Sequence, residues 1–443
     1  MAGRITVVAL GPDDGGLLTR EAAEQLESAQ RLILRTARHA VAKELAERRA
    51  LESLDALYET EEDFDALSRL AARRVIEAAQ GADVCYAVPD PTSDETVRAL
   101  AQALPEGMTL RVLSGVTLAG NAASAVLPYG VSAEPLHALS ATAASATRVR
   151  ADATLVLTEI DHRALAAEVK LWLAELYDDE QTVYFLEDAA VAEPVVTPIP
   201  LYALDRQARY DHRTALVVPA VSYRARRRAD FDDLLAVVAE LRGPGGCPWD
   251  RKQTHESLSR FLVEEACEAA DALGSDDPMK MADELGDVLL QVALNSQIGG
   301  EHRAFTDRDV TSAIVSKMIF RHPHVFSGEK IESAEAAYAV WEQAKAEERG
   351  TQSRKARMED VSAGLPALMR AQKVLRRGEA IPTAAQAKEA LRELVAGDLP
   401  DEALGALLEA ACQLAEARGM DAENALRQRI LRRIEQESDD PAR

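Results

Sequence analysis

The chain has 443 residues, of which 47% are apolar, and its formal net charge is −23. This length predicts about three domains, and the apolar content excludes global disorder. The strongly acidic balance argues against non-specific binding to nucleic acid or to an anionic membrane surface.

The sequence has the pattern of a cytoplasmic protein. No apolar run approaches the ~20 residues that a bilayer-spanning helix needs, and the N-terminal MAGRITVVALGPDD does not read as a signal peptide. The cysteines Cys85, Cys247, Cys267 and Cys412 are far apart and form no CxxC pair. We therefore expect reduced thiols, no disulfide framework and no zinc site.

Residues 1–222 alternate strand-like and helix-like segments. Arg4 to Leu10 is a β-rich run before Gly11-Pro12, and Thr19 suits the N-cap of the helix that follows. This alternation indicates an α/β domain with a substantially parallel sheet. Further strands are predicted at 84–88, 109–113, 154–158, 182–186 and 215–218, and helices at 62–80, 93–103 and 163–176.

The remainder of the chain is predicted to be all-α. It follows the basic run at 224–228, which we interpret as a solvated linker in preference to a phosphate site. The polar stretch 435–443 is expected to be frayed. Helical patterns cover 230–242, 256–273, 278–299, 307–320, 333–349, 363–377, 384–396, 401–418 and 421–437.

Two carboxylate clusters lie inside these apolar helical patterns. Glu264, Glu265 and Glu268 form the first cluster, and Glu284 and Asp287 form the second. Acids three or four residues apart share a helix face, so each cluster projects its carboxylates together. A solvated acidic face is the ordinary interpretation of such spacing. The apolar neighbours instead favour a hairpin whose carboxylates are neutralised by Mg²⁺, with Mn²⁺ as the alternative ion.

A loop rich in glycine and proline precedes the first acidic helix at 242–250. Trp249 in this loop has two interpretations: it stacks on a base, or it anchors the core. Arg251 and Lys252 follow directly and are placed to reach phosphate groups.

Two later segments combine aromatic and basic side chains. Arg321 ends a helix before Pro323 and is a candidate phosphate contact. Trp341 and Lys345 are four residues apart and share a helix face, which suits a base and a phosphate. A packed tryptophan covered by a lysine stem is the alternative.

Residues 230–349 resemble the MazG family of all-α nucleoside triphosphate pyrophosphohydrolases. The resemblance is carried by GCPWD at 246–250, Gln253-Thr254, EExxE at 264–268, ExxD at 284–287, RHPHVF at 321–326 and WEQxK at 341–345. It implies a catalytic domain at 229–350 that hydrolyses nucleoside triphosphates to monophosphate and pyrophosphate with Mg²⁺. It also implies a homodimer formed through the helical half.

The same resemblance implies roles for individual residues. Glu265, Glu268, Glu284 and Asp287 would hold the metal. Glu264 or Glu265 would orient the attacking water, and Glu264 alternatively supports the metal site indirectly or binds another ion. The preferred base and the phosphorus atom that is attacked stay open. The implied substrate contacts are Trp249, Arg251, Lys252, Arg321, Trp341 and Lys345.

The acidic helices show internal sequence similarity to the C-terminal region. DELGDVLL at 283–290 resembles EALGALL at 402–408, and alanines 403 and 406 stand where the first copy has its acids. Upstream, Lys388 and Arg392 occupy the places of Glu264 and Glu268. Two explanations stay open: a degenerate second repeat at 357–437 without metal ligands, or chance similarity between helices of common composition.

The N-terminal domain resembles the tetrapyrrole (corrin/porphyrin) methylase family, in the form fused ahead of MazG domains. LGP at 10–12, YAVP at 86–89 and SGVT at 114–117 carry the resemblance, which implies S-adenosylmethionine bound at strand-end loops. Two departures argue against this cofactor: Asp13 replaces the glycine of a Gly-Pro-Gly-Asp loop, and no glycine precedes Asp90-Pro91. Side chains there obstruct the ligand. A methyltransferase or a bifunctional protein remains the alternative to the hydrolase.

Overall fold

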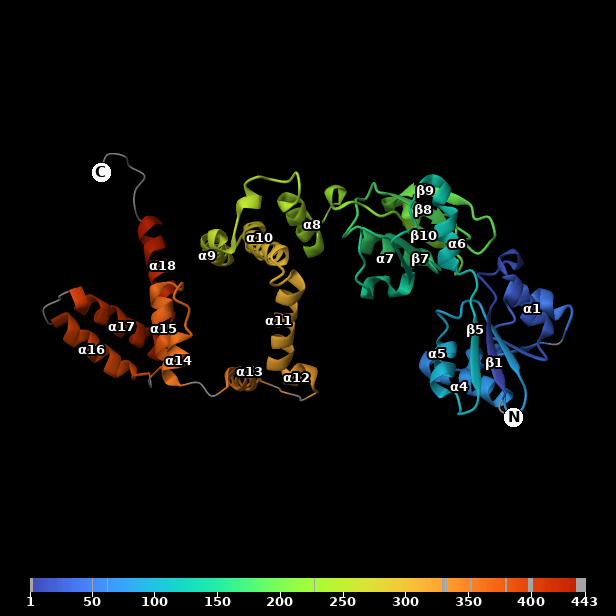
Figure 1. Ribbon diagram of the computed structural model, residues 1–443, viewed down its shortest axis with the longest axis horizontal. Helices are drawn as coiled ribbons and strands as arrows, with labels where there is room; N and C mark the ends of the chain where they lie inside the picture. The colour runs from blue at the N-terminus through green and yellow to red at the C-terminus, as the bar shows by residue number, and fades with distance from the viewer. Residues whose placement is uncertain are drawn as a thin grey trace. The chain divides into compact units, whose positions relative to one another are not determined.

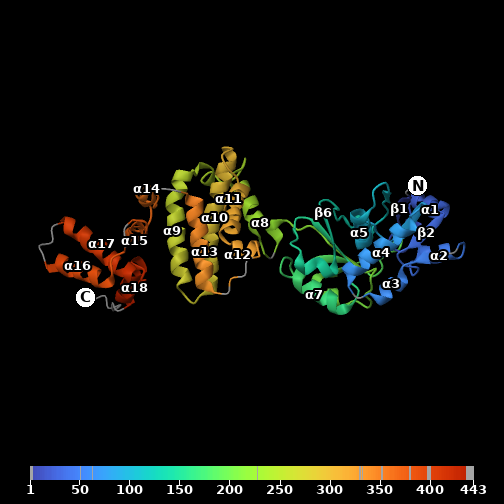
Figure 2. The same ribbon diagram turned by 90° about the horizontal axis from the view of Figure 1, so that it is seen from below.

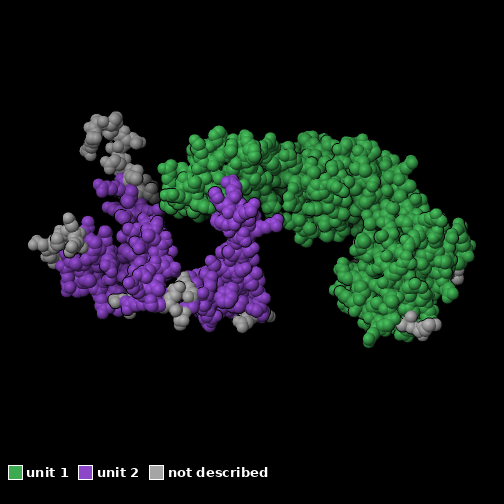
Figure 3. All heavy atoms as spheres, in the orientation of Figure 1, with its two compact units in different colours: residues 1–298 green, residues 299–443 purple. Residues whose placement is uncertain are grey.

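The computed structural model describes residues 3–49, 51–61, 63–226, 228–328, 331, 333–350, 353–378, 381–396 and 401–435. The chain divides into two compact units, residues 1–298 and 299–443 (Figure 3). The boundary falls inside the helix α10 (Pro278–Glu301). Across the described residues, no helix is both long enough and apolar enough to cross a membrane. The tail expected to be frayed, from 436 onward, lies outside the described residues.

A fully parallel sheet opens the chain, with strand order β3-β2-β4-β1-β5. Figure 1 shows β1 and β5 of this sheet between α1 and the pair α4 and α5. The central strands of the sheet are buried because helices cover both faces: Val8 of β1 packs with α1 and α2, and Val7 packs with α4 and α5. The predicted N-cap is confirmed, since the Thr19 hydroxyl accepts a hydrogen bond from Ala22 N at 3.2 Å. The elements are β1 (Arg4–Ala9), α1 (Arg20–Ser28), β2 (Arg31–Leu34), α2 (Ala40–Ala46), β3 (Glu52–Ser53), α3 (Asp55–Thr60), α4 (Phe64–Ala78), β4 (Val84–Val88), α5 (Glu95–Ala103) and β5 (Thr109–Leu113).

The second sheet has the order β6-β7-β10-β8-β9 and is mostly antiparallel. Only β6 and β7 run parallel, so the prediction of a substantially parallel sheet holds for the first sheet alone. The pair β8–β9 is antiparallel because its short connection has no helix to carry the chain back across the sheet, and β10 runs antiparallel to both of its neighbours, β7 and β8. The elements are α6 (Leu118–Ala125), β6 (Leu136–Ser140), β7 (Thr154–Thr158), α7 (Arg163–Leu173), β8 (Thr182–Leu186), β9 (Val196–Pro200) and β10 (Ala215–Val218).

The basic run after β10 is part of the folded structure. The side chain of Arg226 is only 6% exposed, pairs with Asp233 and donates to Val221 O at 2.9 Å. Arg224 pairs with Glu240, and Arg228 pairs with a carboxylate of the α/β domain. Arg227, the remaining arginine of the run, lies outside the described residues. The interpretation as a solvated linker is therefore wrong for Arg226, whereas the side chains of Arg224 and Arg228 stay exposed, at 66% and 62%.

Three helices build the core of the next region, α8 (Phe231–Arg242), α9 (His255–Leu273) and the first part of α10 (Figure 2). Their buried cluster consists of Val238, Leu258, Ala293, Leu294 and Ile298. Side-chain caps define where α8 and α9 begin: Asp230 and Thr254 each accept a hydrogen bond from the backbone of the first turn.

Residues 299–443 are helical throughout their described elements, as predicted. Pro323 ends α11 as expected but also begins a short helix, because proline suits the first helical turn. In the C-terminal bundle, the buried Gln372 amide donates to Glu416 at 3.0 Å and accepts from Ala422 N at 2.8 Å. The elements are α11 (Asp307–Arg321), α12 (Pro323–Phe326), α13 (Ala334–Arg349), α14 (Arg354–Glu359), α15 (Ala367–Arg377), α16 (Ala384–Ala396), α17 (Asp401–Ala417) and α18 (Ala422–Glu435).

Candidate functional site

The loop between α8 and α9 is held in place by Arg242. Its guanidinium donates hydrogen bonds to the carbonyl oxygens of Asp250 and Gln253, so the end of α8 fixes the start of α9. Gly246 is required in this loop, because a Cβ there would lie 2.3 Å from Leu241 O. The sequence analysis missed this role of Arg242, for which the one available signal was its position between a helix and the Gly-Pro-Gly-Gly run.

Trp249 projects from this loop and is 57% exposed. Its ring meets that of Phe261 edge-on, with centroids 6.3 Å apart. Phe261 precedes Glu265 by one helical turn, so this aromatic pair lies on the acidic face of α9. The large exposed area leaves the indole free to stack on a ligand, and a purely core-anchoring role does not fit it.

The carboxylates of α9 and α10 come together as the spacing predicts. Glu265, Glu268 and Glu284 each offer an oxygen, and these oxygens lie within 4.8 Å of one another. Within the described part of the chain, no other three acidic, histidine or cysteine side chains are grouped in this way. Asp287 is not part of this group of three. Glu264, the sequence neighbour of Glu265, is exposed.

The electrostatics of Glu265 reflect this crowding. Burial, together with the negative charges of Asp287, Glu268, Glu264 and Glu284, raises its pKa above the ordinary value. Asp287 is the strongest of these charges, so it acts on the cluster although it is not within the shortest distances. Uncompensated carboxylate repulsion of this kind is what a divalent cation with oxygen ligands relieves. The donor set therefore fits Mg²⁺ or Mn²⁺.

Arg251 and Lys252 lie in a single-turn 3-10 helix, Asp250–Lys252, directly after Trp249. Both side chains are exposed, and neither has an ion pair among the residues that the structure describes. They precede the acidic helix α9 in the sequence, and their exposed side chains are available to an anionic ligand.

The predicted contacts of the second unit form a separate aromatic cluster. Lys345 Nζ lies 4.2 Å from the centre of the Trp341 ring, and the Arg321 guanidinium lies 5.7 Å from it. Tyr338 stacks on the same ring. Arg321 also donates two hydrogen bonds to Glu348, at 2.9 and 2.6 Å. These contacts agree with the packing interpretation, and the predicted role in substrate binding is untested by them.

The loop after β1 is where the methylase resemblance implies S-adenosylmethionine, and side chains shape it. Asp13 has φ of +122°, a backbone conformation that favours glycine. Its carboxylate accepts from Ala40 N at 2.6 Å and lies 3.8 Å from Arg213, while Asp14 accepts from Ala192 N at 3.1 Å. Side chains thus occupy the loop and tie it to neighbouring segments. The residues present do not fit a cofactor that needs close backbone approach.

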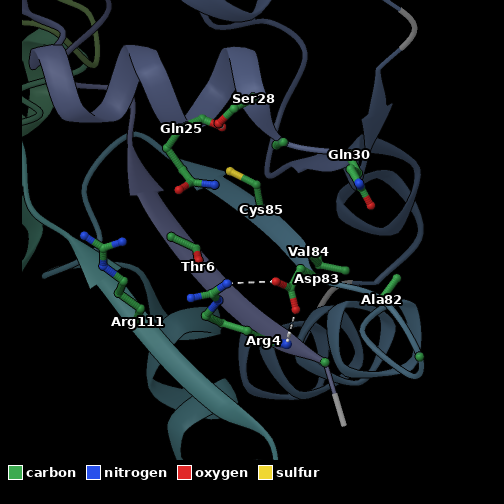
Figure 4. Close-up of a pocket in the computed structure, with 13 residues that line it drawn as sticks. Arg4, Thr6, Gln25, Ser28, Gln30, Ala82, Asp83, Val84, Cys85 and Arg111 are labelled. Carbon is green, nitrogen blue, oxygen red and sulfur yellow. Dashed lines mark hydrogen bonds and ion pairs between the residues drawn. The ribbon is translucent and has the colours of Figure 1, made fainter. Parts of the chain in front are cut away.

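A cavity of about 630 Å³ lies at the amino ends of β1 and β4, opposite that loop (Figure 4). Its two arginines are already paired: Arg4 with Asp83 at 2.9 Å, and Arg111 with Glu21 at 2.5 Å. Burial raises the pKa of the Cys85 thiol in its wall to about 12, which leaves the thiol unreactive at neutral pH. The cavity has no free charge with which to hold a nucleotide.

Comparisons with known proteins agree with both resemblances. A model of the MazG nucleotide pyrophosphohydrolase domain matches residues 253–326, and one of the Tetrapyrrole (Corrin/Porphyrin) Methylases matches residues 4–205. The chain is 35% identical over 378 residues to the uncharacterized protein YabN of Bacillus subtilis, which covers 84% of this chain and 77% of YabN.

Two named hydrolases match the helical region. Nucleoside triphosphate pyrophosphohydrolase/pyrophosphatase MazG of Thermotoga maritima is 37% identical over 216 residues, covering 46% of this chain and 83% of that protein. Nucleoside triphosphate pyrophosphohydrolase of Escherichia coli K12 is 40% identical over 148 residues, covering 33% of this chain and 56% of that protein. The chain therefore belongs to the MazG family, in the YabN-like arrangement in which a tetrapyrrole methylase domain precedes the MazG domain.

Proposed function

We propose that the MazG domain hydrolyses nucleoside triphosphates to nucleoside monophosphate and pyrophosphate, with Mg²⁺ or Mn²⁺ as cofactor. The observation that carries the proposal is the group of carboxylates formed by Glu265, Glu268 and Glu284 on a MazG fold. Relatives named for this activity support it. Removal of non-standard triphosphates from the nucleotide pool is the physiological role that we propose.

Glu265, Glu268 and Glu284, with Asp287 beside them, would hold the ion. When bound, such an ion neutralises phosphate charge and lowers the pKa of water. Glu264 is exposed at the edge of the group and is the candidate to accept the proton of the attacking water. Because both the carboxylates and a triphosphate are negative, basic side chains near the site would also help the substrate to bind.

Trp249, Arg251 and Lys252 supply the remaining interactions of residues 1–298. The exposed indole offers a stacking surface for the base. The two cations offset the charge of the phosphates and stabilise charge that develops during hydrolysis. We keep Arg321, Trp341 and Lys345 as further substrate contacts in this proposal, on the ground of the family motif.

We propose that the helical half forms a homodimer. Leu262 and Val263 on α9, and Leu285 and Leu289 on α10, are 40–53% exposed although they flank the acidic face. Large apolar side chains exposed on both helices of one hairpin favour a surface that another chain covers. A second copy of this helical region is the occupant that fits a self-complementary apolar face.

The alternative function, methyl transfer from S-adenosylmethionine by the N-terminal domain, is disfavoured by the Asp13 loop. A non-catalytic nucleotide sensor is disfavoured by the grouped carboxylates of α9 and α10. Pyrophosphate release by the purified chain, with Mg²⁺ and with a chelator, tests the hydrolase directly. Activity that persists in Glu268→Ala or Asp287→Ala would refute the assignment, and Asp283→Asn, an exposed acid outside the group, is the matched control.

A further inference from the structure

A buried glutamine close to the acidic group lacks a hydrogen-bond partner. Gln291 lies on α10 and is only 6% exposed. Its Oε1 atom is enclosed, and no described residue donates a hydrogen bond to it. Native proteins keep few such atoms, because an unpaired buried acceptor destabilises the fold. An unpaired amide beside a candidate ligand site suits a partner that the ligand supplies.

Gln291 belongs to the acidic face of α10. It follows Asp287 by one turn and Glu284 by two, so the three side chains project from one side of the helix. One turn further on, Asn295 Oδ1 lies 2.7 Å from His255 Nδ1 at the start of α9. Gln291 thus stands between the acids and a polar contact that joins the two helices.

The matching stretch of α9 carries the aromatic pair. Phe261 contacts the half-exposed Trp249 and lies one turn before Glu265. Phe261 and Leu290, the neighbour of Gln291, pack against the same buried cluster of α8, α9 and α10. Phe261 thus links the exposed indole to the cluster against which the neighbour of Gln291 packs.

We propose that Gln291 binds the nucleobase of the substrate. The inference rests on the proposed triphosphate hydrolysis: when the phosphates lie at the carboxylates, the nucleoside extends toward Trp249 and the amide. Glutamine offers one acceptor and two donors, which pair with adjacent donor and acceptor groups on a base edge. A base N–H gives Oε1 the partner that the chain does not provide. Stacking then supplies affinity, and the amide supplies selectivity.

The test replaces Gln291 with methionine, which keeps the length of the side chain and removes its polar atoms. The control is Ser296→Ala: Ser296 is also buried on α10, but its hydroxyl donates to Val292 O at 2.8 Å within the helix. Pyrophosphate release with Mg²⁺ is measured for the common ribo- and deoxyribonucleoside triphosphates and for ribose 5-triphosphate without a base. Melting temperatures are measured in parallel.

We expect Gln291→Met to lower kcat/KM for the best nucleotide roughly 10- to 100-fold and to flatten the preference among bases. Hydrolysis of the base-free substrate and the kinetics of Ser296→Ala should not change. Unchanged kinetics with a higher melting temperature would overturn the proposal, because the amide would then be only an unpaired buried group. An equal loss on the base-free substrate would also overturn it, by placing the contact on sugar or phosphate.

Two further outcomes are distinguishable. If Gln291→Met does not fold, as judged by circular dichroism, Gln291→Asn is measured on the same substrates; it keeps the amide, and a changed base preference is expected. An unaltered preference in that variant would refute the base contact. A wild-type protein without any pyrophosphate release would refute the hydrolase itself, whereas an active wild type with an unaffected variant refutes only the role of Gln291.

Discussion

Neutralising one carboxylate of the acidic group should stabilise the metal-free protein locally. Glu265 lies within 4.8 Å of both Glu268 and Glu284. In a water-like dielectric, each pair of charges at this distance repels by ~0.9 kcal/mol. Two pairs give ~2 kcal/mol, and screening by salt at this partly exposed site reduces the gain to about 1 kcal/mol. Glu265→Gln should therefore slow amide exchange in α9 about fivefold when a chelator is present.

The sign of the pH dependence follows from the raised pKa of Glu265. A carboxyl whose pKa is higher in the folded state favours the fold while it is protonated, and this stability is lost as the pH rises through that pKa. Protection factors in α9 of the metal-free protein, which correct for the pH dependence of intrinsic exchange, should fall as the pH rises above the ordinary glutamate pKa of 4.5. Glu265→Gln should remove this fall in protection.

Added Mg²⁺ should reverse the order of stability. An ion present at a hundredfold excess over its dissociation constant stabilises the folded site by ~2.7 kcal/mol. The wild type should gain this protection, and Glu265→Gln should gain much less because it has lost a ligand. Hydrogen exchange followed by mass spectrometry reports on α9 separately from the other domains, and Asp283→Asn is the control. Equal protection by Mg²⁺ in wild type and Glu265→Gln would refute the metal site.

Three other predictions concern residues around the site. Arg226→Met should destabilise α8 by about 3–5 kcal/mol in hydrogen exchange, because it leaves Asp233 buried without its partner. The same substitution at Arg224, whose pair with Glu240 is exposed, is the control, and an equal loss of protection in both variants would contradict the prediction. Arg242→Ala should raise KM for the triphosphate roughly tenfold with a smaller change in kcat, since the loop that carries Trp249 loses its anchor; an unchanged KM would show that the loop holds without it. Calorimetry should detect no stoichiometric binding of S-adenosylmethionine, and clear binding would restore the methyltransferase alternative despite Asp13.

Much of the α/β region and of the helical region follows from local sequence patterns. The β-rich run from Arg4 and the strand at 84–88 form where predicted, because both are buried parallel strands with continuous apolar sequence. Strands β6 and β9 lack such a continuous apolar sequence and were not predicted. Leu136–Ser140 and Val196–Pro200 contain exposed residues and a proline-rich stretch, and pairing with neighbouring strands determines their conformation.

The acidic group was predictable because helical spacing alone places Glu265 with Glu268. The approach of Glu284 depends on how α9 and α10 pack, which the sequence indicates only through their apolar faces. Gln291 had no signal of its own: a glutamine in an apolar helix acquires meaning only when its burial and its missing partner are visible. The burial of Arg226 in the basic run was missed for a related reason, since its partner Asp233 lies within the following helix and meets it only in the folded structure.

The central claim is that these carboxylates catalyse metal-dependent hydrolysis of nucleoside triphosphates. The most direct measurement is pyrophosphate release by the purified chain across common and damaged triphosphates, with Mg²⁺, with Mn²⁺ and with a chelator. We expect release that requires the metal, is abolished in Glu268→Ala and Asp287→Ala, and is retained in Asp283→Asn. Pyrophosphate release that survives in Glu268→Ala or Asp287→Ala, or that proceeds equally in the presence of chelator, would contradict metal-dependent hydrolysis at this site.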